Sequence, residues 1–311
     1  MKEYGMPYKG SKDKIVETLC SYFPKRNNFY DLFMGGASVT HYQLLQDKFK
    51  NYYANDINSL MTKAFDMAIH GKFSDETRWI SHEDFNVLKN TDPYAAICFS
   101  FGNDLKSYMY GKDCEFYKKA LHYLIMFNDD SLIKQMFPTV DFSYICNIED
   151  LFEKRLSLKK MIDDELSISD DNRLRSRESL ESLQRLQSLE RLQSLERLQI
   201  SSKSYDQIEI KPNSVIYNDP PYKSTNTYDV SKDFDYEKFY SWCERQTELC
   251  FISEYSMPED RFICVAEIEH RSIICANENQ KVVERVFIPR TQSHYLDEIH
   301  EAYCDNNNYL F

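Results

Sequence analysis

The chain has 311 residues and a formal net charge of −12 at pH 7. This length allows one large domain, or one domain with a sizeable insertion, and the acidic balance argues against a generally basic nucleic-acid binder but leaves room for a local basic face. Nine scattered cysteines without a Cys-x-x-Cys pair favour reduced thiols in a cytoplasmic protein. The histidines and cysteines lack the spacing of zinc ligands, so we expect no metal site. No run approaches about 18 apolar residues, so we expect no membrane span.

The first 70 residues alternate between helical and strand-like patterns. Residues 11–23 carry Ile15, Leu19 and Tyr22 at helical spacing after Ser11, a candidate N-cap. Residues 28–33 predict a short strand that runs into a glycine turn, residues 37–46 predict a helix, and residues 51–57 predict a second strand. This order is typical of a βαβ unit and begins a parallel sheet.

Residues 71–172 are rich in aromatic side chains and mostly helical by pattern. The clearest helix covers residues 114–127, where Phe116, Ala120 and Tyr123 or Leu124 recur at helical spacing. We interpret this region as an inserted helical subdomain. The acidic stretch 163–171 is a plausible exposed linker leaving it.

Residues 173–199 contain a leucine repeat, whose three hexapeptide copies occupy 182–187, 188–193 and 194–199. Leucines strictly three residues apart drift by about 60° per step around an α-helix, so six of them cannot face one core. A heptad coiled coil, which alternates steps of three and four, does not fit either. We therefore expect a surface helix or linker, with a partner-binding helix as the alternative.

Strand-like segments return from residue 198, at 198–201, 215–219, 250–255 and 283–288, separated by helix-sized gaps. The sheet that began before residue 60 thus resumes after the insertion. We predict an α/β protein with a Rossmann-like doubly wound sheet. Its catalytic domain would comprise residues 1–70 and 198–311, with 71–172 as the inserted subdomain and 173–197 as the repeat helix or linker.

Two acidic residues follow the first two predicted strands. The stretch from Asp31 to Gly36 runs from strand into glycine turn, where Gly35 and Gly36 allow a ligand to approach the backbone; a purely structural tight turn is the alternative. Asp56 ends the second strand, where an acid can accept hydrogen bonds from a ribose diol or can instead cap a helix.

A short motif with Tyr8, Gly10 and Lys12 precedes the first helix. Lys12 could pair with a carboxylate and Tyr8 could cover a ring, while the simpler interpretation is a basic terminus.

The third motif is Asp219-Pro220-Pro221-Tyr222, directly after an apolar run. Two prolines end the strand in a rigid turn, and the Asp219 carboxylate and Pro220 carbonyl offer two acceptors that suit a planar –NH₂ group. Accepting both hydrogens localises the nitrogen lone pair and makes the amine a usable nucleophile, while Tyr222 can stack on the ring of a flipped-out base. A strand-ending turn without chemistry is the alternative.

Together these motifs resemble the Dam-like (D12 class) DNA adenine-specific N6-methyltransferases. The tyrosine–lysine element, glycine turn, insertion and Asp-Pro-Pro-Tyr follow one another in the order of that family, and the resemblance covers residues 4–70 and 198–290. It implies a methyltransferase sheet with an inserted target-recognition subdomain, and transfer of a methyl group from S-adenosylmethionine to the 6-amino group of adenine in double-stranded DNA.

The resemblance also implies site residues. Asp219, Pro220, Pro221 and Tyr222 match the catalytic motif. The positions implied for cofactor binding are Tyr8, Lys12, Asp31, Phe33, Gly35, Gly36, Asp56, Tyr205 and Asp219. At the family's short acid–aromatic element Tyr205 keeps the aromatic, but Ser204 stands where an acid is usual.

Aromatic and basic residues interleave between positions 97 and 119, a pattern that can contact phosphates and wedge bases. The residues implied for DNA contact are Lys106, Tyr108, Lys112 and, beside the catalytic motif, Lys223. A core helix with solvated lysines is an equal alternative for this segment.

We further expect a cytoplasmic monomer or weak dimer, with a cognate restriction endonuclease as a possible partner. Two other functions remain open. One is methylation of another planar amine, such as an RNA base or a glutamine side chain. The other is that of an inactive paralogue that binds DNA without turnover.

Overall fold

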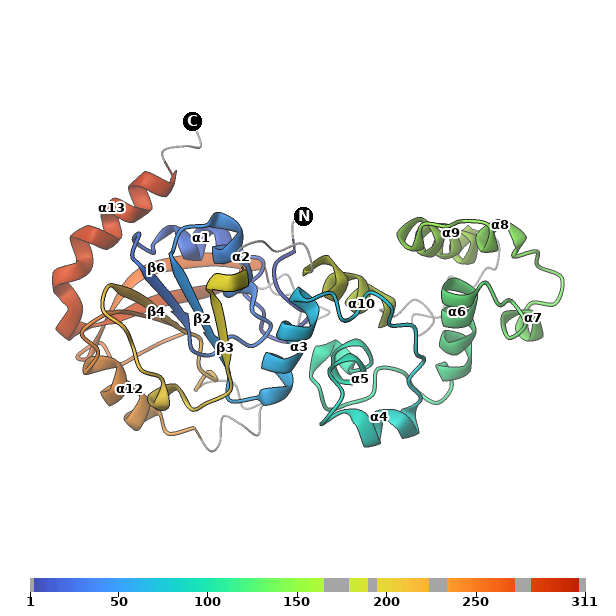
Figure 1. Ribbon diagram of the computed structural model, residues 1–311, viewed down its shortest axis with the longest axis horizontal. Coiled ribbons are helices and arrows are strands. Elements are labelled where there is room, and N and C mark those ends of the chain that lie inside the picture. The colour runs from blue at the N-terminus through green and yellow to red at the C-terminus, as the bar shows by residue number, and fades with distance from the viewer. Residues whose placement is uncertain (1–2, 165–178, 190–194, 224–233, 272–280, 308–311) are drawn as a thin grey trace. The chain divides into compact units, whose positions relative to one another are not determined.

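The computed structural model describes residues 3–164, 179–189, 195–223, 234–271 and 281–307. The chain divides into two compact units (Figure 1). Unit 1 comprises residues 1–6, 10–70 and 189–311, and unit 2 comprises residues 7–9 and 71–188. The acidic segment 163–171 and parts of the leucine repeat lie largely outside the described residues.

Unit 1 is built on a sheet of seven strands within the described residues, in the order β3-β2-β1-β4-β5-β7-β6. The strands are β1 (Asn28–Asp31), β2 (Asn51–Asn55), β3 (Leu198–Ser201), β4 (Ser214–Asn218), β5 (Leu249–Glu254), β6 (Phe262–Arg271) and β7 (Lys281–Pro289). Strands β1 to β5 pair in parallel, and β7 is antiparallel to both β5 and β6. The predicted α/β class with a mainly parallel sheet is thereby confirmed.

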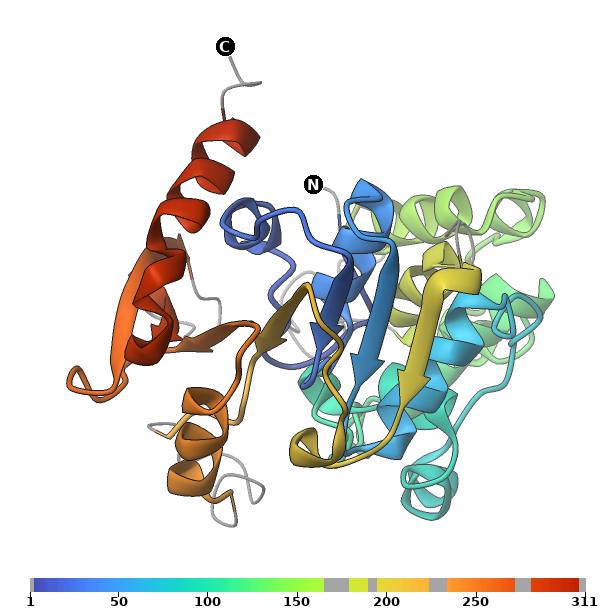
Figure 2. The ribbon, with the colours of Figure 1, turned by 60° about the vertical axis from the view of Figure 1, so that its left-hand side comes forward.

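The sheet joins segments that are far apart in the chain. Figure 2 shows the yellow strand β3 beside the blue strand β2, where Tyr52 pairs with Leu198. On the other side of β1, Asn28 pairs with Ser214 of β4. Strands β4 and β5 are buried along their whole length, as expected for parallel strands covered on both faces. The strand order reverses between β1 and β4, which makes this the topological switch point of the sheet.

The α-helices of unit 1 within the described chain are α1 (Val16–Ser21), α2 (Ser38–Gln46), α3 (Ser59–Ile69), α12 (Tyr236–Glu244) and α13 (Leu296–Asn307), and its 3₁₀ helices are η4 (Leu195–Arg197), η5 (Tyr205–Gln207) and η6 (Arg290–Tyr295). Side chains of Asn58 and Asp235 cap α3 and α12 by accepting backbone N–H bonds. The expected cap at Ser11 is wrong. Its hydroxyl accepts the N–H of Asp13 at 3.3 Å in a local turn, and the helix begins only at Val16.

Strand β6 is absent from the sequence prediction. Phe262, Ala266 and Ile268 are buried, and Glu267 lies exposed between the last two, but Cys264 is exposed and interrupts the alternation. Such a half-buried strand is typical of an antiparallel edge pair. It pairs with β7 through a register shift between Cys264 and Ala266.

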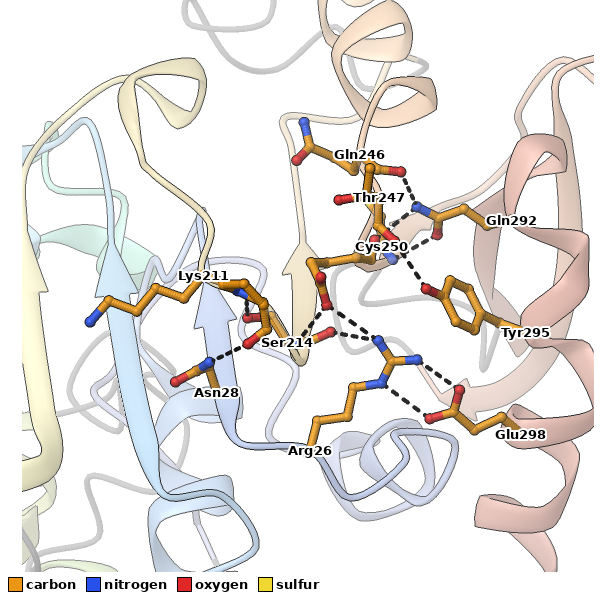
Figure 3. A network of polar contacts seen from close by, with 12 residues as sticks. Arg26, Asn28, Lys211, Ser214, Gln246, Thr247, Cys250, Gln292, Tyr295 and Glu298 are labelled. Atoms are coloured by element: carbon orange, nitrogen blue, oxygen red, sulfur yellow. Dashed lines mark hydrogen bonds and ion pairs between the residues drawn. The ribbon is translucent and has the colours of Figure 1, made fainter.

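A buried arginine ties the start of β4 to the C-terminal helix (Figure 3). The guanidinium of Arg26, with a side chain 8% exposed, donates to both carboxylate oxygens of Glu298 at 3.1 and 2.7 Å and to the Ser214 carbonyl at 3.1 Å. It also stacks over the ring of Tyr295 at 4.6 Å. This bidentate arrangement fixes α13 against the rest of unit 1.

The regular secondary structure of unit 2 within its described residues is helical, apart from an isolated bridge between Ser100 and Tyr108. Its helices are α4 (His82–Leu88), α5 (Pro93–Cys98), η1 (Phe101–Asn103), α6 (Glu115–Phe127), α7 (Ile133–Met136), α8 (Ser143–Cys146), α9 (Leu151–Asp164) and α10 (Ser179–Ser188). In the chain as described, no helix is both long and apolar enough to cross a membrane.

The expectation that the leucine repeat forms a surface helix is wrong for its first copy. That copy lies in α10, where Leu180, Leu183 and Leu186 are buried in unit 2. The helix ends at Ser188, so only three leucines drift, by about 120°, and this still fits one apolar face. The last copy behaves differently, because it forms the 3₁₀ turn Leu195–Arg197 and then enters β3.

Candidate active site

Three acidic residues gather where the strand order reverses. Asp31 is the last residue of β1, Asp56 follows β2, and Asp219 follows β4. Because β1 lies between β2 and β4 in a parallel arrangement, the carboxyl ends of all three strands share one edge of the sheet. This edge is where open α/β sheets bind their ligands.

The glycine turn after β1 is fastened to the neighbouring strand. The Gly35 N–H donates to Asp56 Oδ2 at 2.8 Å, and the Met34 N–H donates to the Asn55 carbonyl at 2.9 Å. Asp56 Oδ1 accepts the Asn58 N–H at 2.8 Å. Burial raises the pKa of Asp56, and these two backbone hydrogen bonds oppose the rise. Asp56 therefore holds the turn itself, whatever else it binds.

A third glycine, Gly5, supports the turn formed by Gly35 and Gly36, and sequence reasoning missed it. The Met6 N–H donates to the Gly36 carbonyl at 2.6 Å, which brings the backbone of Gly5 against the turn at φ +72°. A Cβ on Gly5 would lie 2.4 Å from the Gly36 oxygen. The rarity of glycine in the chain was the available signal, because each one is then expected to occupy a position that other residues cannot.

Asp31 is 1% exposed and only partly satisfied. Its Oδ2 accepts the Thr40 hydroxyl at 2.8 Å, whereas Oδ1 has no hydrogen-bond partner within the described part of the chain. Burial raises the pKa of Asp31 from 3.8 to about 7, the Thr40 hydroxyl opposes the rise, and the Asp219 and Asp56 carboxylates add to it. A buried acceptor atom without a partner is well suited to receive a donor from a ligand.

Lys12 and Asp219, far apart in the sequence, form an ion pair with 2.7 Å between Nζ and Oδ2. The Lys12 ammonium also lies 3.8 Å from Glu284 of β7. Burial alone would lower the pKa of Lys12, but the two carboxylates outweigh it and raise that pKa. Burial raises the pKa of Asp219 against the opposing charge of Lys12. The sequence suggested a carboxylate as the partner of Lys12 but did not say which one. Sequence reasoning did not find Glu284.

The ring of Tyr222 is held on several sides. Its hydroxyl donates to Glu284, and the edge of Tyr255 meets it with ring centroids 4.7 Å apart. The Lys12 ammonium lies 4.9 Å from its centroid. Burial, followed by the nearby carboxylates, raises the pKa of Tyr222 well above its ordinary value, so the phenol stays a hydrogen-bond donor.

The backbone of the Asp-Pro-Pro-Tyr turn is fixed on both sides of Tyr222. The Tyr236 hydroxyl donates to the Pro221 carbonyl at 2.7 Å, and the Lys223 N–H donates to Glu254 Oε2 at 3.2 Å. Glu254 is buried at the end of β5, and this burial raises its pKa to about 7. The Lys223 side chain itself is exposed, with its ammonium 5.7 Å from the ring of Tyr236.

Aromatic rings line the other side of the glycine turn. Phe33 stacks on Tyr205 with centroids 5.5 Å apart and 29° between the planes, and Phe234 and Phe239 meet Phe33 edge-on. The rings thus form one apolar group that brings together residues following β1, β3 and β4.

The acid that Ser204 lacks is found two residues later. The Ser204 hydroxyl donates to Asp206 at 2.5 Å, and the other oxygen of Asp206 pairs with Lys238 at 2.6 Å. The Lys238 and Ser204 contacts hold the pKa of Asp206 below its usual range.

The remaining predicted residues, Tyr8, Lys106, Tyr108 and Lys112, belong to unit 2. Tyr8 is half-buried there. Lys106 and Lys112 are exposed, whereas Tyr108 donates to the Ile80 carbonyl at 2.9 Å and stacks on a histidine. Across the described residues, no three His, Cys, Asp or Glu side chains gather closely enough to hold a metal ion.

Comparison with known proteins identifies one family. Residues 8–146 match the model of the D12 class N6 adenine-specific DNA methyltransferases. No curated protein matches the chain. The matched region contains the tyrosine–lysine element, the glycine turn and Asp56, and extends into unit 2, while Asp219 and Tyr222 lie beyond it. Over residues 8–146 the chain is therefore similar to the D12 class N6 adenine-specific DNA methyltransferases.

Proposed function

We propose that this protein transfers the methyl group of S-adenosylmethionine to the 6-amino group of an adenine in double-stranded DNA. The observation that carries the proposal is the position of Asp219. Its carboxylate follows β4 in a rigid Asp-Pro-Pro-Tyr turn, at the same switch point as the glycine turn and Asp31.

The residues at this edge fit S-adenosylmethionine. The methionine end of the cofactor carries an ammonium group, and the unpartnered Oδ1 of Asp31 is an acceptor for such a donor. Asp56 retains lone pairs for ribose hydroxyls beyond its two backbone bonds. The stacked rings of Phe33 and Tyr205 offer an apolar surface to an adenine ring. When bound, the cofactor supplies an electrophilic methyl group.

The chain's own residues act on the target base. The Asp219 carboxylate and the Pro220 carbonyl accept the two hydrogens of the amino group and orient its lone pair. The ring of Tyr222 stacks on a base that has left the helix. Because burial raises the pKa of Asp219, its carboxylate accepts a proton more readily than an exposed one. Positioning and electrostatics supply the rate enhancement.

Unit 2 serves, in this proposal, as the target-recognition subdomain. Lys106 and Lys112 are exposed and can contact phosphates. Between Ser100 and Tyr108 the chain forms a bridged loop that carries Phe101, which is 67% exposed. An exposed ring on a loop that also carries the exposed Lys106 suits insertion between bases. Tyr108, whose hydroxyl is used within the unit, acts by positioning this loop.

The direct test is expression of the chain in a host that lacks adenine methylation, followed by methylation-sensitive sequencing of the genomic DNA. Asp219→Ala is expected to abolish methylation while the thermal unfolding transition is kept. Asp305→Ala, an exposed acid on α13, is the matched control and should methylate normally. Near-normal methylation by Asp219→Ala would refute the mechanism. Binding of S-adenosylmethionine without turnover by the unaltered chain would instead identify an inactive paralogue, and methylated RNA or protein would identify another planar amine.

A further inference from the structure

The Lys12 ammonium occupies positions that the target adenine needs. It contacts Asp219 Oδ2 at 2.7 Å, the carboxylate that must accept the amino group. It also lies 4.9 Å from the centroid of the Tyr222 ring, on which the base must stack. A base entering the site therefore competes with Lys12 at both contacts.

Lys12 cannot leave Asp219 without another partner. The side chain is buried, and an unpaired buried ammonium costs several kcal/mol. Proton loss is no alternative, because the surrounding carboxylates raise the pKa of Lys12. Displacement of Lys12 thus needs a second carboxylate within reach.

Glu284 meets this need. Its carboxylate, 3% exposed, lies 3.8 Å from the same Nζ atom, so a shift of roughly 1 Å gives a full ion pair. Its Oε1 also accepts the hydroxyl of Tyr222. Glu284 therefore contacts both Lys12, which the base must displace, and Tyr222, on which the base must stack. The other buried acid nearby, Glu254, already accepts the N–H groups of Lys223 and Tyr255.

We propose that Glu284 is a positioning residue that receives the Lys12 ammonium when the target amine binds Asp219, and that it orients the Tyr222 ring through the phenol hydroxyl. In the structure Lys12 holds the place of the base, and Glu284 is the site to which it moves. This inference rests on the proposed function, since it assigns a step within adenine methylation.

Two variants separate the charge of Glu284 from its hydrogen bond, and a third serves as the control. Glu284→Gln removes the charge but keeps an acceptor for Tyr222, so we expect kcat/KM for DNA to fall about ten-fold or more. Tyr222→Phe removes the hydroxyl but leaves the charge, so its loss should be smaller. Glu284→Gln should also move the acidic limb of the pH–rate profile to lower pH, because a neighbouring negative charge that raises the pKa of Asp219 is gone. Glu267→Gln is the matched control, since Glu267 is an exposed acid of the same hairpin that pairs with Arg285.

A second measurement is independent of activity. Side-chain ¹⁵N NMR of lysine-labelled protein, with the signal assigned by Lys12→Met, should show a lower pKa for Lys12 in Glu284→Gln than in the unaltered chain. An unchanged Lys12 titration, or a Glu284→Gln enzyme with the kcat/KM and pH profile of the unaltered chain, would overturn the inference. If the unaltered chain transfers no methyl group, the proposed function fails, while the lysine titration still decides whether Lys12 and Glu284 are coupled.

Discussion

Replacement of Asp31 by Asn tests the electrostatics of the site without relying on activity. The change is nearly isosteric. The amide oxygen can still accept the hydrogen bond that the Thr40 hydroxyl donates to Asp31 Oδ2 at 2.8 Å in the unaltered chain. The amide nitrogen would occupy the place of Oδ1, which has no partner in the chain as described. This unsatisfied donor should cost about 1–3 kcal/mol at every pH. The informative quantity is therefore the change with pH.

The sign follows from the raised pKa. Between pH 4 and 7 the folded chain holds a proton on Asp31 that the unfolded chain releases, because the pKa rises from 3.8 to about 7 on folding. The contribution of Asp31 to the free energy of unfolding is fully present below pH 3.8, and it is lost as the pH rises through about 7. A shift of roughly 3 units corresponds to at most about 4 kcal/mol. Asn does not titrate, so Asp31→Asn should lack this loss.

The assay is urea unfolding of both proteins at steps between pH 4 and 8.5. The free energy of unfolding of the variant, relative to the unaltered chain, should increase steadily up to about pH 7 and then level off. Asp305→Asn, on an exposed face of α13, should show a difference that is flat with pH. A flat difference for Asp31→Asn as well would show that its carboxylate is not electrostatically strained, and would refute the reasoning.

Three further substitutions test contacts that stabilise the fold. Gly5→Ala should cost about 2–4 kcal/mol of unfolding free energy, because its Cβ would lie 2.4 Å from the Gly36 oxygen at φ +72°; a denaturation midpoint unchanged from the unaltered chain would contradict this. Leu183→Ala should cost about 2–5 kcal/mol in unit 2, measured by chemical denaturation, whereas a truly surface helix would lose almost nothing. Arg26→Met should cost about 2–3 kcal/mol, because the partly buried Glu298 loses both hydrogen bonds, and hydrogen exchange should show α13 opening first; equal protection in both proteins would argue against it.

Local patterns predicted much of the fold. The strand of residues 28–31, the helix of 38–46 and the strand of 198–201 carry clear apolar runs or periodicity, and each is found close to its expected bounds. The positions of Asp31, Asp56 and Asp219 at strand ends were likewise visible, because an acid after an apolar run needs only local information.

Contacts between distant segments could not be read in this way. Gly5 matters because another loop crosses it, and Glu284 matters because β7 carries it to Lys12. Neither residue lies in a sequence motif that indicates a catalytic or binding role. The repeat was misjudged for a related reason, since the drift of its leucines depends on where the helix ends, and α10 ends at Ser188.

The first and last copies of the leucine repeat adopt different secondary structure, and this difference has an evolutionary consequence. The copies at 188–193 and 194–199 are identical in sequence, yet the end of the last one is a strand, while the nearly identical first copy is a helix. Because each copy is a whole number of codons, gain or loss of one preserves the reading frame. It also preserves the sequence that enters β3, where Ile200 and Ser201 follow only the last copy. The gene can therefore vary the length of chain between α10 and β3 in steps of six residues without rewriting either element.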